Sequence, residues 1–219
     1  FKQKYNLNGS FRYDGGNRLG RSSQARWLPT ATVAASWNID QEDFFKNIKD
    51  INYLKLRASY GLTGSLGNAT NSAAVYRSTT SIRPYLEEKE TELYIADLEN
   101  SELTWEKKNT INVGLDAGML LNRIRLSFDY YYNTSFDLID EVKTSGIGGQ
   151  YTKQANNADL TGSGIEASLT ATPVRNKDWE WNIGANFGTN YTKITKTAAL
   201  PDIWSLIQAS GGNYLGYPV

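Results

Sequence analysis

Acidic residues gather in the middle of the chain, and paired carboxylates are the first chemistry that the residue types suggest. Two Asp or Glu side chains can together hydrolyse a glycosidic bond, and several can ligate calcium. The spacing here is not that of an EF-hand loop, and a charge run of this kind is typical of a solvated loop. We therefore favour a loop, with no metal site and no catalytic residue, for this group: Glu87, Glu88, Glu90, Asp97, Glu99 and Glu102.

A second candidate is the glycine-rich run at residues 162–167, whose spacing fits a dinucleotide-binding fingerprint. That fingerprint requires a helix directly after the glycines, so that the pyrophosphate meets the helix start. A strand pattern follows instead, which favours a glycine-rich entry to a strand. We expect no cofactor.

The chain of 219 residues has no Cys and no His. This excludes Cys/His zinc sites, thiol redox chemistry and His-based catalytic triads. Lys and Arg together number 23, as do Asp and Glu, and the basic residues are scattered, so nothing indicates a nucleic-acid partner.

Aromatic residues with a polar tip are abundant, with 14 Tyr and 6 Trp against 7 Phe. Such rings suit a lipid–water interface or a sugar-binding surface. Packing within loops is the commoner role for a loop Tyr. The candidates for contact with a substrate or partner lie in presumed outer loops: Tyr76, Tyr85, Tyr94, Tyr151, Trp204 and Tyr214.

The elements that would position these residues are β-strands. Between residues 105 and 136, apolar and polar residues alternate on both sides of a break at residues 120–122, which predicts a hairpin of two strands. Each row lasts about 9 to 11 residues, the length needed to cross a bilayer, whereas soluble strands average about 5 to 6. Tyr130, Tyr132 and Trp105 are predicted to mark the lipid–water interface.

Five further alternating segments predict five more strands, at residues 4–13, 32–39, 54–62, 165–171 and 179–187. No run of about 18 apolar residues occurs, which excludes helical membrane spans. Residues 63–104, 137–160 and 192–219 are predicted to be loops without regular structure. The connections alternate between long and shorter, as in outer-membrane barrels with long outer loops.

We therefore predict an all-β fold, a segment of an antiparallel up-and-down transmembrane β-barrel. Seven strands with open edges cannot lie in a bilayer alone, so more chain or other subunits must close the barrel. One set of charged residues shares the polar parity and is predicted to face the lumen. There these residues could touch substrate or plug, and we favour ion pairing across neighbouring strands. These residues are Arg12, Lys55, Arg57, Asp116, Arg125, Asp129 and Glu166.

Several strings, in order and spacing, resemble the SusC/RagA family of TonB-dependent outer-membrane transporters. They are SFRYDG at 10–15, WLP at 27–29, LKLRASYGLTG at 54–64 and LTWEK at 103–107. The resemblance covers nearly the whole chain, and residues 54–64 are its most specific part. It is weak after Gly64, where loops of this kind contact substrate.

The resemblance implies that residues 1–219 are part of a barrel of about 22 strands around a plug. It also implies import of oligosaccharides or peptides across the outer membrane of a Gram-negative bacterium, with a SusD-like surface lipoprotein and with TonB. We expect the plug, the TonB-contacting segment and the signal peptide to lie outside this chain. Two alternatives stay open: a soluble secreted carbohydrate-binding protein of the lectin or adhesin kind, and an enzymatic barrel using carboxylates.

Overall fold

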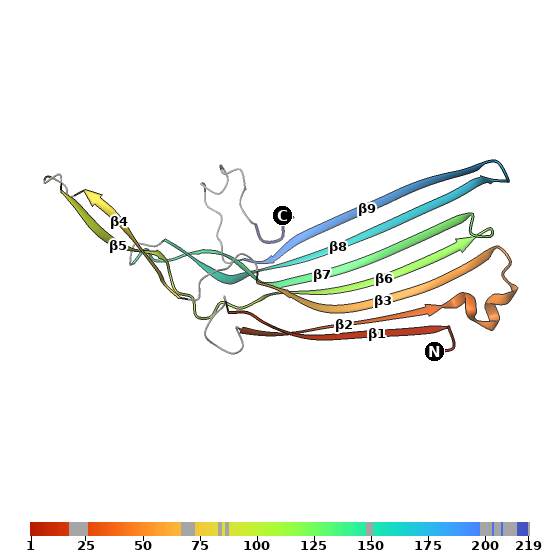
Figure 1. Cartoon of the computed structure of the whole chain (residues 1–219), viewed down its shortest axis with the longest axis horizontal. Coiled ribbons are helices and arrows are strands. Elements are labelled where there is room, and N and C mark those ends of the chain that lie inside the picture. Colours follow the sequence, from red (N-terminus) through yellow and green to blue (C-terminus); the bar gives the residue numbers. More distant parts are fainter. Residues whose placement is uncertain are drawn as a thin grey trace.

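The computed structural model describes residues 1–17, 26–66, 73–82, 85, 88–147, 151–197, 203, 207 and 214–218. Its main feature is one antiparallel sheet in the order β1-β2-β3-β6-β7-β8-β9 (Figure 1). The seven predicted strands are confirmed, and neighbours in the sheet follow each other along the chain. Their bounds are Tyr5–Gly15 (β1), Trp27–Asn38 (β2), Ile51–Ser65 (β3), Glu106–Met119 (β6), Ile124–Lys143 (β7), Thr152–Arg175 (β8) and Glu180–Lys196 (β9).

A separate two-stranded hairpin, β4 (Val75–Ile82) and β5 (Lys89–Asp97), lies between β3 and β6 in the chain. It projects beyond one end of the sheet (Figure 1). The prediction of an irregular loop over residues 63–104 was therefore wrong. The hairpin hides its strand period because Ser, Thr and charged residues occupy both of its faces, as in the opposed pairs Thr80–Thr91 and Ser81–Glu90.

Three of the predicted boundaries were also wrong. β7 continues to Lys143 and β8 begins at Thr152, so most of the predicted loop at 137–160 is strand. β9 runs to Lys196 rather than ending before the predicted tail. The strand register shifts between Ser135 and Leu138 of β7 and again between Asp159 and Leu160 of β8. At each shift one strand of the pair carries an extra residue, so its side chains beyond that point change faces. This interrupts the alternation from which strands are predicted.

The two ends of the sheet differ. At the end that we call the turn end, residues 39–50, 120–123 and 176–179 connect the strands, and the first of these links holds the 3₁₀ helices η1 (Ile39–Gln41) and η2 (Asp43–Asn47). The opposite end, which carries the β4–β5 hairpin, is the loop end. The predicted alternation of link lengths fails twice: residues 16–26 and 144–151 at the loop end are each a shorter link than 39–50 at the turn end. The second is short because β7 and β8 extend outward instead.

Neighbouring links at the turn end are bonded to each other. Asn52 accepts a hydrogen bond from the backbone N–H of Leu121 through its side-chain oxygen (2.6 Å), and the carbonyl of Asp50 accepts one from Leu120 (2.9 Å). Leu120, Leu121 and Asn122 all have positive φ angles, between 51° and 60°. The β6–β7 turn is therefore held in a left-handed conformation by the β2–β3 link beside it.

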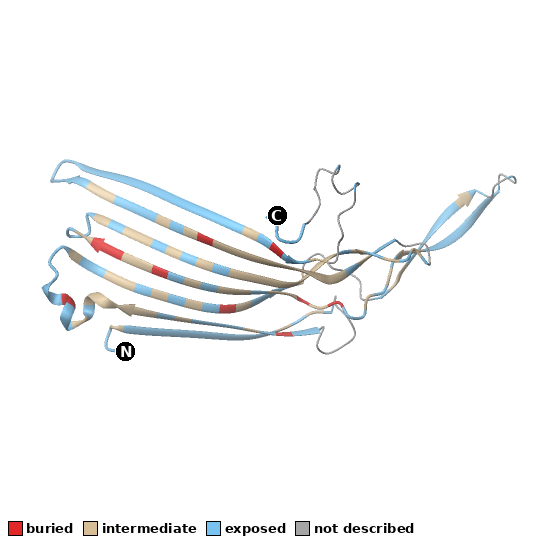
Figure 2. Ribbon diagram, turned by 180° about the vertical axis from the view of Figure 1, so that it is seen from behind, coloured by how far each residue is buried: buried red, intermediate tan, exposed pale blue. Residues whose placement is uncertain are grey.

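The sheet is a single layer with little interior (Figure 2). The accessible surface is 15513 Å², whereas a compact monomer of this size exposes about 10,000 Å². The buried hydrophobic residues of the described ranges are Leu28, Phe45, Leu103, Trp105, Ala117 and Ile194. None of the helices described is long and apolar enough to cross a membrane.

The largest buried cluster lies at the loop end, where Leu28, Leu103 and Trp105 pack with Leu66 and Ile139. Trp105 is 7% exposed. The prediction that it marks a lipid interface was wrong, because a side chain enclosed by this cluster cannot lie against lipid. The segment before β6 packs against Ile139 of β7 and is hydrogen-bonded to β8.

Candidate functional site

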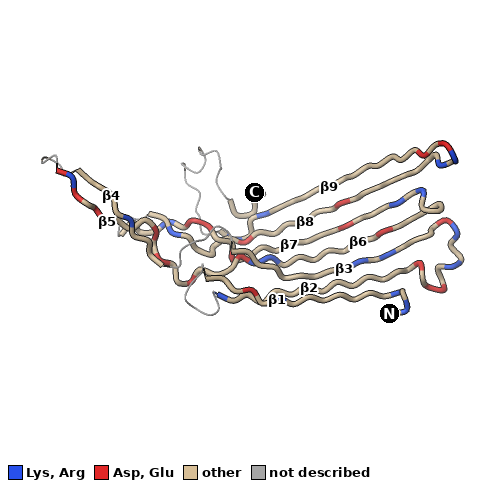
Figure 3. The backbone as a smooth tube through the Cα atoms, in the orientation of Figure 1, with Lys and Arg blue, Asp and Glu red and all other residues tan. Residues whose placement is uncertain are grey.

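The register of the sheet divides its side chains between two faces. One transverse row across all seven strands reads Tyr5, Trp37, Leu56, Leu115, Phe128, Ala167 and Phe187. The next row reads Asn6, Ser36, Arg57, Gly114, Asp129, Glu166 and Gly188. Because successive side chains of a strand point to opposite faces, the sheet has an apolar face and a polar face. Charged residues are sparse along the strands and gather at the two ends (Figure 3).

The predicted polar-parity residues share the polar face, and three of them form one ion-paired group. Arg57 on β3 donates from Nε to Asp116 Oδ2 (2.8 Å) and from Nη2 to Asp116 Oδ1 (3.1 Å). Its Nη2 also donates to Asp129 Oδ2 on β7 (2.9 Å), and Ser127 Oγ donates to Asp116 Oδ1 (2.8 Å). The predicted ion pairing across neighbouring strands is confirmed for this group, which links three strands through one guanidinium.

Arg57 reaches β7 because β6, the strand between, carries Gly114 at the crossing point. A Cβ atom at this position would lie 2.7 Å from Arg57 Nη2 and would also overlap the Asp129 carboxylate. Only glycine leaves that space empty. The charge pattern of Arg57, Asp116 and Asp129 could be read from the sequence, but their meeting over Gly114 depends on the register.

The other predicted residues of this face are placed separately. Lys55 lies opposite Asp116, and Glu166 lies opposite Asp129. Arg12 is far away at the loop end, where it pairs with Asp14 on its own strand (2.9 Å). Over the ranges that the structure describes, Lys55, Arg125 and Glu166 make no hydrogen bond or ion pair.

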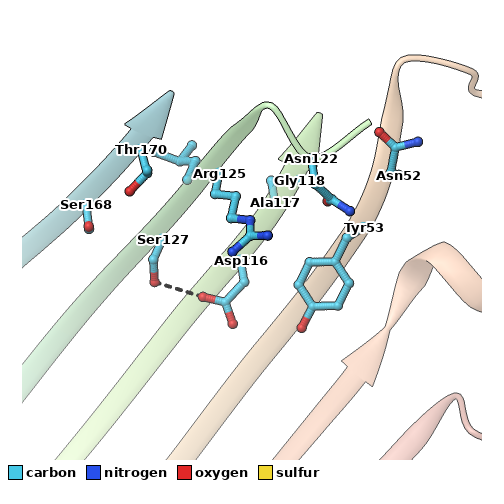
Figure 4. A pocket seen from close by; sticks show the side chains of 11 residues that line it. Asn52, Tyr53, Asp116, Ala117, Gly118, Asn122, Arg125, Ser127, Ser168 and Thr170 are labelled. Carbon is cyan, nitrogen blue, oxygen red and sulfur yellow. Dashed lines mark hydrogen bonds between the residues drawn. The ribbon is translucent and has the colours of Figure 1, made fainter. Parts of the chain in front are cut away.

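Arg125 lies in a hollow of about 500 Å³ on the polar face near the turn end. Figure 4 shows its side chain extending from β7 over β6, where its end lies between the side chains of Asp116 and Asn122, with Tyr53 of β3 beyond them. Ser168 and Thr170 of β8 line the opposite edge.

The predicted aromatic contact residues do not converge on one site. Tyr76 and Tyr94 lie on opposite faces of the β4–β5 hairpin, since Tyr76 pairs with Ile95 and Tyr94 with Arg77. Tyr85 is fully exposed, Tyr151 is exposed above Gly146, and Tyr214 makes an edge contact with Tyr217. Trp204 lies outside the described residues.

Sequence reasoning missed the polar contacts that fasten the loop end. Asn156 on β8 donates from Nδ2 to the carbonyls of Thr104 (2.8 Å) and Asp137 (2.6 Å), and its Oδ1 accepts from the Thr104 N–H (2.7 Å). Asn100 donates to the carbonyl of Gln154 (2.7 Å). An Asn residue in a polar segment carries no signal of such a role, because the partners are backbone groups distant in the chain.

A second missed feature is a carboxylate bound by three donors at the turn end. Glu42 accepts hydrogen bonds from Lys4 Nζ (2.8 Å), the Tyr5 hydroxyl (2.8 Å) and Trp37 Nε1 (3.1 Å). These bonds, that from Lys4 above all, lower the pKa of Glu42 to about 2. The link between β2 and β3 is thereby tied to the start of β1.

Long antiparallel strands in a single curved layer, apolar on one face and polar on the other, define the wall of a transmembrane β-barrel. Residues 1–219 match the family model described as TonB dependent receptor-like, beta-barrel. The chain belongs to this family of TonB-dependent receptors, and within it to the SusC/RagA group.

Relatives of known name agree with this assignment. The TonB-dependent receptor SusC of Bacteroides thetaiotaomicron is 31% identical over 199 residues, which are 88% of this chain and 19% of SusC. A TonB-dependent receptor of Formosa agariphila is 30% identical over 205 residues, 90% of this chain and 18% of the relative. A solved structure of the RagAB peptide transporter superposes with a TM-score of 0.77 at 30% identity, over 90% of this chain and 21% of that chain. The chain thus spans about a fifth of the relatives it matches.

Proposed function

We propose that this chain is part of the barrel wall of a TonB-dependent active transporter in the outer membrane of a Gram-negative bacterium. The apolar face would contact lipid and the polar face would line the lumen. One observation carries this proposal: between the register shifts, apolar and polar rows alternate across all seven strands, and in the part of the chain that the structure describes no second layer covers the apolar rows. Lumen-facing positions are then Arg12, Lys55, Arg57, Asp116, Arg125, Asp129 and Glu166.

Aromatic pairs at both ends of the β1–β2 hairpin support this placement. Tyr5 stacks with Trp37 near the turn end (6.4 Å between ring centroids), and Tyr13 stacks with Trp27 near the loop end (5.1 Å). Eight residues separate the two Tyr, which is about 26 Å along a strand and about 20 Å of height at a tilt of roughly 40°. That is close to the apolar band of about 25 Å between the aromatic girdles of outer-membrane barrels.

The tilt can be worked out from the rows themselves. The row that holds Tyr5 and Trp37 reaches Phe187 on β9, but the exposed Trp181 of β9 lies six residues nearer the turn end. If both mark the same membrane surface, the strands shift by about 20 Å over six strand spacings of about 4.8 Å. This corresponds to a tilt of about 35°, within the range of membrane barrels.

We propose that the whole protein imports oligosaccharides or peptides together with a SusD-like surface lipoprotein, driven through TonB and a plug. The similarity to the RagAB peptide transporter supports a peptide cargo, and the similarity to the TonB-dependent receptor SusC supports coupling to TonB. Without His or Cys in these residues, transport rather than catalysis is the activity we propose. The loop residues Tyr76, Tyr85, Tyr94, Tyr151, Trp204 and Tyr214 are the proposed contacts for cargo or lipoprotein.

The test uses the full-length gene. The protein should fractionate with the outer membrane, migrate as a heat-modifiable band and co-purify with a lipoprotein. Single cysteines at two adjacent positions of β8 then assign the faces: these 219 residues contain no Cys, and any Cys elsewhere in the full-length protein is first replaced by Ser. Leu169→Cys should react only with a lipid-soluble maleimide and Ser168→Cys with a water-soluble one. A soluble, folded product that binds sugar would refute the transporter and support a lectin-like protein.

A further inference from the structure

The loop end of the β1–β2 hairpin carries a pair of stacked aromatic rings on the apolar face. Tyr13 and Trp27 are parallel, with an interplanar angle of 1° and 5.1 Å between their ring centroids. The Trp27 ring takes the space over Gly15 of β1, where a Cβ atom would overlap it. Both rings stay open to the surroundings, at 59% exposure for Tyr13 and 46% for Trp27. The hairpin thus presents a preformed aromatic surface that the described residues leave about half open.

A cation lies beside these rings. Arg26 directly precedes Trp27, and the two residues line one hollow of about 780 Å³ at this end of the hairpin. The carbonyl of Arg26 accepts a hydrogen bond from the Gly16 N–H (2.8 Å), which fixes the backbone that carries the side chain. The guanidinium is exposed and, over the ranges that the structure describes, pairs with no acid. The connection formed by residues 16–26 contains three Arg and no Asp or Glu, so this end of the hairpin is positively charged.

Toward the turn end, the same face continues as an apolar strip. Phe11 and Leu7 extend the row of Tyr13 along β1, and both side chains are strongly exposed. In the proposed function this strip lies against lipid, and Tyr13 and Trp27 lie at its outer edge. The order along the hairpin is therefore an apolar strip, an aromatic surface and a cation. An amphiphile that fits this order has acyl chains, then a sugar that packs on the rings, then an anionic group.

We propose that this end of the hairpin binds the headgroup of a phosphorylated glycolipid of the outer leaflet, with a sugar ring against Trp27 and a phosphate on Arg26. This inference rests on the proposed function, because the apolar face must meet lipid and the loop end must face the outside. The guanidinium of an arginine matches a phosphate in both shape and charge. The flat face of an indole suits the apolar side of a sugar ring. A soluble sugar would leave the apolar strip of Phe11 and Leu7 without a partner, whereas a lipid-linked sugar covers it.

The experiment uses the purified full-length receptor in detergent with added lipid A, a phosphorylated glucosamine lipid. A photo-crosslinking amino acid at Asn17, which lines the same hollow, converts bound lipid A into an adduct that a gel resolves. Arg26→Gln should raise the lipid A concentration for half-maximal adduct about tenfold, the effect of one lost charge-assisted contact. Trp27→Leu should raise it about threefold, through the loss of the aromatic surface. With lipid A stripped of phosphate, binding to the parent should weaken and Arg26→Gln should make no further difference.

Arg12→Gln is the matched control. Arg12 is another exposed arginine of this hairpin, but it lies on the polar face and pairs with Asp14, so its loss should leave the adduct unchanged. Equal weakening by Arg12→Gln and Arg26→Gln would overturn the proposal, as would equal binding of phosphate-free lipid A or an adduct with a soluble cargo instead. Every variant is first checked for heat-modifiable migration in the outer membrane. A parent protein that lacks this property refutes the barrel itself, whereas a parent that has it and forms no lipid A adduct refutes only this site.

Discussion

Replacing Gly114 by Ala should break the contact that joins β3 to β7. The new Cβ would occupy space now taken by the end of the Arg57 side chain, 2.7 Å from Nη2, and by the Asp129 carboxylate. Arg57 can retain its two bonds to Asp116 by moving back toward its own strand. The bond to Asp129 must lengthen or break, because it passes directly over the glycine.

The size of the effect follows from the exposure of the groups involved. A hydrogen bond between charged groups contributes roughly 1.5–3 kcal/mol when buried. The Arg57 side chain is 34% exposed and that of Asp129 21%, so solvent screens part of this interaction. We expect Gly114→Ala to lower the free energy of unfolding by about 1–2 kcal/mol, about tenfold in the equilibrium constant. The usual gain from replacing a strand glycine, about 0.5–1 kcal/mol, opposes this loss.

The matched control is Gly162→Ala on β8, which lies on the same face between two strands and would meet only ordinary contacts, the nearest at 3.7 Å. Urea unfolding of the full-length receptor in detergent, followed by its heat-modifiable band, compares the two variants. Gly162→Ala should be slightly more stable than the parent and Gly114→Ala less stable. In an Asp129→Ala background, Gly114→Ala should lose most of its effect on the free energy of unfolding. Equal stabilisation by both alanines would refute the role of the bridge.

Three further predictions test other parts of the wall. Leu169→Arg on the apolar face should lower the free energy of unfolding by about 2–4 kcal/mol, whereas Ser168→Arg on the polar face should be milder; equal losses by the same urea assay would contradict the assignment of faces. Glu42→Gln should lower the thermal midpoint at neutral pH. Because the folded pKa of Glu42 is lowered to about 2, the difference from the parent should be full above about pH 4.5, shrink below it and vanish near pH 2. Leu103→Ala, at a fully buried position, should cost about 2–5 kcal/mol in urea unfolding, and a loss below 1 kcal/mol would argue against the loop-end cluster.

Alternation alone was sufficient to predict the seven strands of the sheet, because both faces of this wall have uniform surroundings over most of their length. Val113, Leu115 and Ala117 face one side and Gly114 and Asp116 the other, as their parity requires. For the same reason, the sequence could predict that Arg57 forms an ion pair with a neighbouring strand. Its partner on β7 was not, since that contact skips a strand and requires glycine at one point of the register.

The prediction failed where the surroundings stop being uniform. Beyond Ser135 on β7 and before Ala158 on β8, irregular pairing places an extra residue in one strand, so a parity carried over from the regular part of the sheet assigns the wrong face to the outer ends of these strands. The prediction for Trp105 failed for a different reason. Its position beside a row of apolar residues is equally compatible with a lipid interface and with a buried cluster, and only the fold of residues 100–105 onto β8 distinguishes the two.

The two ends of the wall are stabilised in different ways, and this bears on where it can move. At the turn end the links 39–50 and 120–123 are bonded to each other or to a strand, through Asn52, Asp50 and Glu42. At the loop end the β4–β5 hairpin has strand partners only within itself, and Asn156 and Asn100 fasten its base to β8 and β7. A two-stranded ribbon alone is marginally stable in water. Rearrangement on contact with cargo or lipoprotein should therefore be confined to the hairpin beyond that base, while the turn end keeps the geometry of the Arg125 hollow.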